Sequence, residues 1–216
     1  MQRYYPILVS IENKRCVVVG GGAVGERRTG GLLEAGADVL LVCPDIASSR
    51  LREWKEAGAI RHLPKLFSPE DLEGASLVIA ATGSGELNGW ICDEAKRRGI
   101  QANSASDATR GSFIVPAVVR RGGLVMSVSA SGAGPALSAR IAAELRSRYG
   151  PEYANLTAVL GAVRERVLAA VSEAPERRKL LRAAVSDRAV AVWLSMGTLP
   201  ETEELVAMLK EWADSR

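Results

Sequence analysis

The sequence predicts an α/β fold built on a parallel sheet, and two observations lead to this prediction. Short apolar runs, too continuous for surface strands, alternate with helical segments along the first half of the chain, which indicates parallel pairing with right-handed crossovers. The character of the sequence then changes near residue 112, and from about residue 134 onward the pattern is helical. With 216 residues, the chain is long enough to bury a core.

Most of the strands predicted in the sheet are short β-branched or apolar runs. Three of these runs are residues 15–19, 39–43 and 76–81. The helical segments that separate or follow them are about residues 23–35, 47–57 and 87–98. Ser68, Pro69 and Asp71 have the spacing of a capped short helix that Gly74 closes, and a further strand is expected from Gly99 to Asn103.

The remaining elements follow from turn signals and helical periodicity. Residues 112–121 and 122–131 are predicted to contain two strands around a glycine pair, with Pro116 at an edge. A stripe with three-four spacing then indicates an amphipathic helix; it comprises Leu156, Val159, Leu160, Val163, Val167, Leu168 and Val171. A second apolar stripe lies in residues 198–216 and comprises Leu205, Met208, Leu209 and Trp212. The sequence leaves open whether this stripe packs on the core of the same chain or on a second copy of the protein.

Composition excludes several classes of protein. The chain has 28 basic and 25 acidic residues, a formal charge of +3, which is too small an excess to indicate nucleic-acid binding. No long apolar run or secretory signal is present, so we expect no membrane segment and a cytoplasmic location. The thiols lack CxxC spacing, which is typical of buried residues in a reducing compartment; they are Cys16, Cys43 and Cys92. The single histidine, His62, excludes a multi-histidine metal site.

The most informative motif is CVVVGGGAVGERR, which places Gly20, Gly22 and Gly25 in G-x-G-x-x-G register between a buried strand and a helix. In a Rossmann-type sheet the first glycine permits the tight turn, the second lets a diphosphate approach the backbone, and the third lets the helix press on the strand. Unpaired amides at the helix start face the negative charge. A glycine turn that only packs is the alternative.

Two further strand ends extend this predicted dinucleotide site. Asp45 lies 20 residues beyond Gly25, where an acid that binds the adenosine ribose is expected, although it could instead cap the following helix. No arginine stands directly at that strand end, so NAD is favoured over NADP. Ala81 and Thr82, at the end of another strand, offer small side chains where the dinucleotide crosses the sheet; an ordinary strand-to-helix turn is the alternative.

These residues resemble a known family. The ordered set YPILVSIENKRCVVVGGGAVGERR, LLEAGADVLLVCP, LVIAATGSGELN and SFIVPAVVRRGGLVMSVSASGAGPALSARI is similar to precorrin-2 dehydrogenase, across about residues 4–148. The resemblance implies NAD-dependent oxidation of precorrin-2 to sirohydrochlorin in sirohaem synthesis; some members also insert ferrous iron. It also implies a homodimer in which the segment after about residue 113 crosses over. For NAD it implies contacts to Ala23 and Val24 in the glycine turn and to Pro44 beside Asp45.

The resemblance also suggests catalytic and substrate residues, with one departure. Similar proteins usually carry an aspartate three residues after the asparagine that corresponds to Asn103, but this chain has Ser106 there and Asp107 next. Either Asp107 acts as the base, or the site uses Ser106 and solvent; a turn-capping role is the alternative for Asp107. The other substrate candidates suit a polycarboxylate, since they are hydroxyls and small residues at a helix start or basic groups; they are Ser129, Ser131, Gly132, Arg110 and Arg140.

The sequence therefore predicts a Rossmann-type NAD-binding domain over 1–112, a small β/helix dimerisation and substrate segment over 113–149, and a helical C-terminal region over 150–216. The expected function is precorrin-2 dehydrogenation, with precorrin-2 and sirohydrochlorin as ligands. Ferrochelation is a bifunctional variant of it. The alternative from a different class is a non-catalytic NAD-sensing module with a helical dimer arm.

Overall fold

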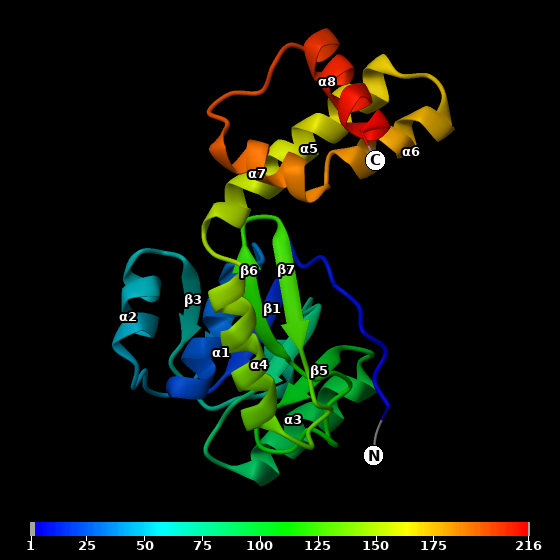
Figure 1. Ribbon diagram of the computed structural model, residues 1–216. Helices are drawn as coiled ribbons and strands as arrows, with labels where there is room; N and C mark the ends of the chain where they lie inside the picture. The colour runs from blue at the N-terminus through cyan, green and yellow to red at the C-terminus, as the bar shows by residue number, and fades with distance from the viewer. Residues whose placement is uncertain (1–2, 216) are drawn as a thin grey trace. The chain divides into compact units, whose positions relative to one another are not determined.

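Five strands form one parallel sheet in the computed structural model, which describes residues 3–215 (Figure 1). The strand order is β3-β2-β1-β4-β5, so the first strand of the chain lies at the centre. Its partners are in register from Arg15↔Asp38 on one side and from Cys16↔Leu77 on the other. The strands are β1 (Arg15–Val19), β2 (Asp38–Val42), β3 (Ile60–Leu63), β4 (Leu77–Ala80) and β5 (Gln101–Ser104). This arrangement confirms the predicted α/β fold with a Rossmann-type parallel sheet.

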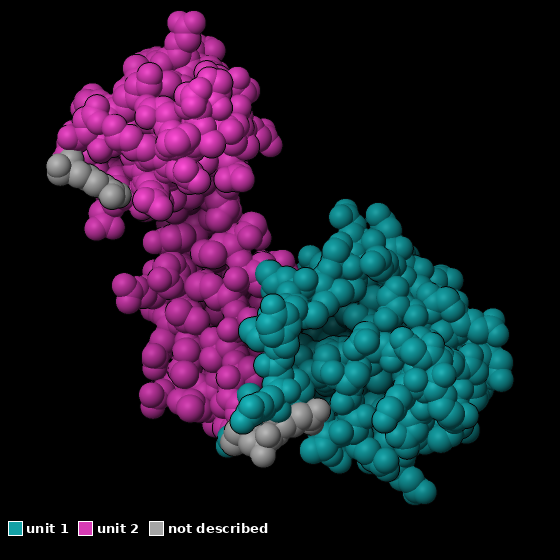
Figure 2. Space-filling view, turned by 90° about the vertical axis from the view of Figure 1, so that its right-hand side faces the viewer, with its two compact units in different colours: residues 1–115, 131–133 teal, residues 116–130, 134–216 magenta. Residues whose placement is uncertain are grey.

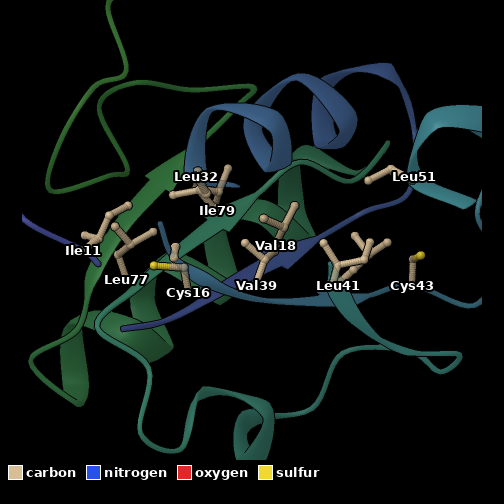
Figure 3. Close-up of a cluster of buried hydrophobic side chains, with 12 residues drawn as sticks. Ile11, Cys16, Val18, Leu32, Val39, Leu41, Cys43, Leu51, Leu77 and Ile79 are labelled. Atoms are coloured by element: carbon tan, nitrogen blue, oxygen red, sulfur yellow. The ribbon is translucent and has the colours of Figure 1, made fainter. Parts of the chain in front are cut away.

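Alternate residues of the strands build two cores, one on each face of the sheet. On one face Cys16 and Val18 of β1 pack with Leu32 of α1 and Leu51 of α2, as the close-up in Figure 3 shows. On the other face Val17 and Val19 pack with α3 and a short 3₁₀ helix, η1. Both faces are therefore covered, which is why the central strands β1, β2 and β4 are almost continuously apolar. The helices of this unit are α1 (Ala23–Leu33), α2 (Ser49–Glu56), η1 (Pro69–Leu72) and α3 (Gly85–Arg97).

The chain divides into two units, which Figure 2 colours separately. The first comprises residues 1–115 and 131–133, and the second comprises 116–130 and 134–216. The three-part division expected from the sequence stays a prediction. In the second unit an antiparallel hairpin of β6 (Ala117–Arg121) and β7 (Leu124–Val128) is followed by helices. These are α4 (Pro135–Arg148), α5 (Glu152–Ala170), α6 (Ala174–Ala183), α7 (Asp187–Ser195) and α8 (Thr202–Asp214).

The last four helices share one core of their own. Leu156, Val163 and Val167 of α5 are buried together with Leu180 of α6 and Trp193 of α7. The C-terminal stripe joins this core, because Leu205, Leu209 and Trp212 of α8 are buried in the same cluster and Met208 packs against it. Of the two alternatives for that stripe, packing on the chain's own core is the one observed.

Local signals in the sequence predicted most ends of helices and strands to within about two residues. The start of α2 shows how such a difference arises. The sequence predicted a helix from about residue 47, with a cap as one of two alternatives for Asp45, but α2 begins at Ser49 because Ser48 accepts the Leu51 N–H at 3.1 Å. Asp45 therefore caps no helix. The short helix after Ser68 has the predicted capping box with Asp71 and is a 3₁₀ turn. In the described part of the chain no helix is long and apolar enough to cross a membrane.

Candidate functional site: a dinucleotide cradle at the carboxyl edge of the sheet

The glycine loop between β1 and α1 has the close approaches that require glycine. Gly20 has φ +118°, and a Cβ there would collide with the carbonyl oxygen of Ala81. A Cβ at Gly25 would collide with the carbonyl of Gly20, so the start of α1 lies directly against the loop. Gly20 and Gly25 are thus required by packing alone, in the roles that the motif predicts for them.

Gly22 differs from the other two glycines of the motif, because a Cβ at this position would meet nothing within 4 Å. Its φ of −90° is also ordinary for any residue. Packing within the chain therefore gives no reason for a glycine here. Gly22 is the N-cap of α1 and provides no side-chain cap, which leaves the first-turn amides of exposed Ala23 and Val24 without intrahelical partners. Open space beside free amides at a helix start fits a bound diphosphate.

The loop after β2 is fastened to the glycine loop. The carbonyl of Gly21 accepts the N–H groups of Ala47 at 3.1 Å and Ser48 at 3.3 Å. The Ser48 hydroxyl also donates to a carboxylate oxygen of Glu26, at 2.6 Å, one residue beyond the last glycine of the motif. The exposed loop residues Pro44 and Asp45 are thereby held beside the glycine loop. The carboxylate of Asp45 has no hydrogen-bond or ion-pair partner within residues 3–215, so it is available for a ribose.

The two nearby arginines are already engaged. Arg52 donates from Nε to the carbonyl of Ile46 and from Nη2 to that of Ala47, both at 3.1 Å. The guanidinium of Arg50 lies 5.2 Å from the centre of the Trp54 ring. These contacts agree with the preference for a free ribose hydroxyl over a 2′-phosphate.

His62 supports the same loop from β3. Its Nε2 lies 3.0 Å from the carbonyl oxygen of Cys43, so the ring contacts the residue that precedes Pro44. Burial raises the pKa of the Cys43 thiol, and Asp45 adds to the effect, so Cys43 stays a neutral, small packing group. No motif in the sequence indicated this contact between His62 and Cys43.

On the other side of β1, the end of β4 carries Ala81 and Thr82. The Ala81 N–H donates to the Val19 carbonyl, and this bond holds the end of β4 beside the glycine loop. Asn88 of α3, fully buried, then fixes Thr82: its Oδ1 accepts the Thr82 N–H at 3.0 Å and the Thr82 hydroxyl at 2.8 Å. Sequence analysis did not identify Asn88, because a helical asparagine carries no motif of its own.

The end of β5 and its following loop hold the predicted catalytic residues. Asn103 is buried and donates from Nδ2 to the carbonyl of Phe113 at 3.0 Å, while its Oδ1 is buried without a partner. Ser106 accepts a hydrogen bond from Asn88 Nδ2 at 3.1 Å, which brings it close to Thr82. The structure thus brings Thr82, a candidate for cofactor binding, and Ser106, a catalytic candidate, to one asparagine.

Asp107 is exposed, and its Oδ1 accepts both the hydroxyl and the N–H of Thr109, at 2.7 and 2.8 Å. These two bonds, the hydroxyl first, lower the pKa of the Asp107 carboxyl, and Arg110 adds to the effect. The carboxylate therefore has the turn-capping geometry that was the alternative for it. A lowered pKa also makes it a weaker base than an ordinary aspartate.

The other substrate candidates lie on exposed surface or in turns. Arg110 packs on Gly89 and pairs with Asp93 at 3.3 Å, and Arg140 pairs with Glu144 at 3.3 Å on α4. Ser131 and Gly132 both have positive φ, 51° and 86°, in the turn before α4. The helix itself is capped at Gly134 without a side-chain bond, so neither Ser129 nor Ser131 is its N-cap. Substrate roles for these residues stay predictions.

Comparison with known proteins agrees with this geometry. Residues 7–117 match the family described as "Putative NAD(P)-binding". Siroheme synthase of Chromobacterium violaceum is 34% identical over 176 residues, which cover 82% of this chain and 37% of that protein. Siroheme synthase of Nitrosospira multiformis is 34% identical over 217 residues, covering 94% and 46%. The chain thus spans less than half the length of these relatives.

A solved structure extends the likeness to nearly the whole chain. "SirC, precorrin-2 dehydrogenase" superposes with a TM-score of 0.74 at 26% sequence identity, and the match covers 96% of this chain and 100% of that one. The similarity therefore includes the helical second unit as well as the sheet.

Proposed function

This chain belongs to the NAD(P)-binding family of the precorrin-2 dehydrogenases, and from that premise we propose that it oxidises precorrin-2 to sirohydrochlorin with NAD⁺. The observation that carries the proposal is the glycine loop, where Gly22 is open to a ligand while Gly20 and Gly25 are closed by packing. A loop that only packs has no use for the open glycine. The free carboxylate of Asp45 beside it supports NAD over NADP.

The proposed binding groups for NAD follow the carboxyl edge of the sheet. The amides of Gly22, Ala23 and Val24 would face the diphosphate, and Asp45 beside Pro44 would accept hydrogen bonds from the adenosine ribose. Ala81 and Thr82 would border the cofactor where it crosses β4. NAD⁺, when bound, supplies the hydride acceptor.

In the overall reaction precorrin-2 loses two hydrogens. One is transferred to the nicotinamide as a hydride, with two electrons, and the other is released as a proton to a base or to water. This chain contributes the orientation of the reacting carbon and the surroundings of that proton. Asp107 is the carboxylate nearest in sequence to the usual position, and its bonds to Thr109 keep it ionised and able to accept. Solvent beside Ser106 is the other route for the proton. Asn103, Ser129, Ser131, Gly132, Arg110 and Arg140 are proposed to contact the substrate.

The dehydrogenase assay tests this proposal directly. Purified protein mixed with precorrin-2 and NAD⁺ under anaerobic conditions is expected to form NADH and sirohydrochlorin in equal amounts, and NADP⁺ is expected to support less turnover. Nucleotide binding without turnover would favour the NAD-sensing alternative. Absence of both would overturn the enzymatic and the sensing functions together.

The proposal also includes ferrochelatase activity, a homodimer and a cytoplasmic location. The first two of these come from family resemblance alone. Anaerobic incubation of sirohydrochlorin with ferrous iron, with and without the protein, tests whether the chain accelerates metal insertion. Light scattering of the purified protein tests the homodimer. A cytoplasmic location is supported by the free, buried thiols of Cys16, Cys43 and Cys92, and fractionation of cells would test it.

A further inference from the structure

The hydrogen-bonding capacity of Asn88 is completely used. Its Oδ1 accepts two bonds from Thr82, and its Nδ2 donates to the Thr82 carbonyl at 3.2 Å and to Ser106 Oγ at 3.1 Å. An asparagine side chain has two acceptor sites and two donors. Because the Thr82 N–H can only donate, it fixes which end of the amide carries the oxygen. Asn88 must therefore be a donor to Ser106.

Ser104 lies on the other side of Ser106, and its burial determines the direction of the bond between them. The two hydroxyl oxygens are 3.2 Å apart, and Ser104 Oγ already accepts the Asp107 N–H at 3.1 Å. Ser104 is only 4% exposed, so its proton needs an acceptor inside the protein. The oxygen of Ser106 is the acceptor that the geometry offers. Ser104 thus donates to Ser106.

Ser106 Oγ consequently accepts two hydrogen bonds, one from Asn88 and one from Ser104. Both of its lone pairs are occupied, while its own proton has no acceptor among residues 3–215. Ser106 is exposed, and Gly85, at the start of α3, has no side chain to cover it, since a Cβ there would lie 3.7 Å from the hydroxyl. A serine in this state can donate to a ligand but cannot accept a proton from one.

We propose that Ser106 is a dedicated hydrogen-bond donor to a carboxylate of the ligand, and that Asn88 and Ser104 are positioning residues that hold it in that state. The inference rests on the proposed function, because the ligand it assigns is the polycarboxylate tetrapyrrole. It gives Ser106 a binding role and leaves the released proton to Asp107 or to solvent. The aspartate that similar proteins carry at this position could not do the same task, because an ionised carboxylate only accepts hydrogen bonds.

Substitutions at Ser106 separate a donor from a base. We expect Ser106→Ala to weaken sirohydrochlorin binding, followed by absorbance titration, roughly 10- to 100-fold, since a hydrogen bond to a charged group is lost. The Kd for NAD⁺, measured by calorimetry, is expected to stay at the wild-type value. Ser106→Thr keeps the hydroxyl and is expected to restore binding. Ser106→Asp is expected to bind more weakly than Ser106→Ala, because it places a negative charge against the ligand carboxylate.

A double-mutant cycle tests the positioning role. Asn88→Ala is expected to weaken sirohydrochlorin binding in wild type but to add little in the Ser106→Ala background, because both changes remove the same bond. Ser112→Ala is the matched control, because it also removes a side-chain hydrogen bond next to β5. The Ser112 hydroxyl accepts the N–H of Ala102, a β5 residue, at 2.9 Å and has no hydrogen bond to Thr82 or Ser106. If Asn88→Ala does not fold, which circular dichroism reports, the three Ser106 variants decide alone.

Each outcome supports or overturns the inference. Equal sirohydrochlorin binding by wild type and Ser106→Ala would overturn it while leaving the dehydrogenase intact. A Ser106→Asp variant with increased kcat and unchanged tetrapyrrole binding would also overturn it, because a base would then be preferred at this position. A wild-type protein that neither binds sirohydrochlorin nor oxidises precorrin-2 would overturn the proposed function, and the donor assignment with it.

Discussion

Replacing Gly22 by alanine separates cofactor binding from folding. The new methyl group would meet no atom of the chain within 4 Å, and the backbone angles at this position, φ −90° and ψ −172°, suit alanine. The folding cost is then limited to the weaker N-cap that alanine provides, about 0.5–1 kcal/mol. If the diphosphate passes at this point, the same methyl group occupies ligand space.

The expected loss of affinity follows from the cost of one extra carbon in a close-packed contact, about 1–3 kcal/mol. This corresponds to roughly a 5- to 150-fold higher Kd for NAD⁺. Calorimetric titration with NAD⁺ measures the affinity, and urea unfolding monitored by circular dichroism measures the stability. Wild-type affinity in Gly22→Ala would show that the diphosphate does not cross the loop here and would refute the reasoning.

Two neighbouring glycines serve as controls. Gly31 is an exposed residue of the same helix with nothing within 4 Å of its added Cβ. We expect Gly31→Ala to raise the free energy of unfolding by about 1 kcal/mol, from helix propensity alone, and to leave NAD⁺ binding unchanged. Gly25→Ala is expected to destabilise the first unit, because its Cβ meets the Gly20 carbonyl. The three substitutions are thus expected to differ in their combined effects: Gly22→Ala mainly weakens NAD⁺ binding, Gly31→Ala only raises stability, and Gly25→Ala lowers stability.

Further changes test the neighbouring contacts. Asp45→Ala is expected to weaken NAD⁺ binding about tenfold and NADP⁺ binding less, by calorimetry; an equal loss for both would contradict ribose recognition. Ser48→Ala is expected to cost about 1–2 kcal/mol in urea unfolding, because the α2 cap is lost. The lowered pKa of Asp107 favours its ionised form in the native state, a contribution present above the unfolded pKa and lost as pH falls through the folded pKa. Thr109→Val is therefore expected to raise that pKa and, if Asp107 is the base, to move the acid limb of the pH–rate profile upward, with NMR titration as the check. Leu209→Ala is expected to cost the second unit about 2–5 kcal/mol without altering NAD⁺ affinity.

The sequence predicted the three central strands, β1, β2 and β4, well because they are buried on both faces. A run such as CVVV at residues 16–19 has no polar position, so its location does not depend on knowing its neighbours. The glycine spacing likewise placed the loop between β1 and α1. Helix starts were harder: Asp45 and Ser48 are both capping residue types, and only the structure shows that Ser48 caps α2.

The candidate site was only partly predictable for a related reason. Motif spacing reports residues close together along the chain, whereas Thr82, Asn88 and Ser106 meet only after α3 packs on β4 and β5. The direction of the Ser104–Ser106 bond depends further on burial, which a sequence does not state. Asp107 shows the same limit, since its neighbour Thr109 could have been noted but not the bonds that occupy its carboxylate.

The central place of β1 in the sheet also governs the order in which the chain can fold. One edge of β1 can pair with β2 as soon as the first helical crossover has formed, but the other must wait for β4, which is separated from it by two further helical elements and β3. The α5–α8 bundle, by contrast, is assembled from consecutive helices. Because local contacts form faster than distant ones, refolding is expected to show a rapid helical phase followed by slower closure of the sheet, so nucleotide binding would be regained last.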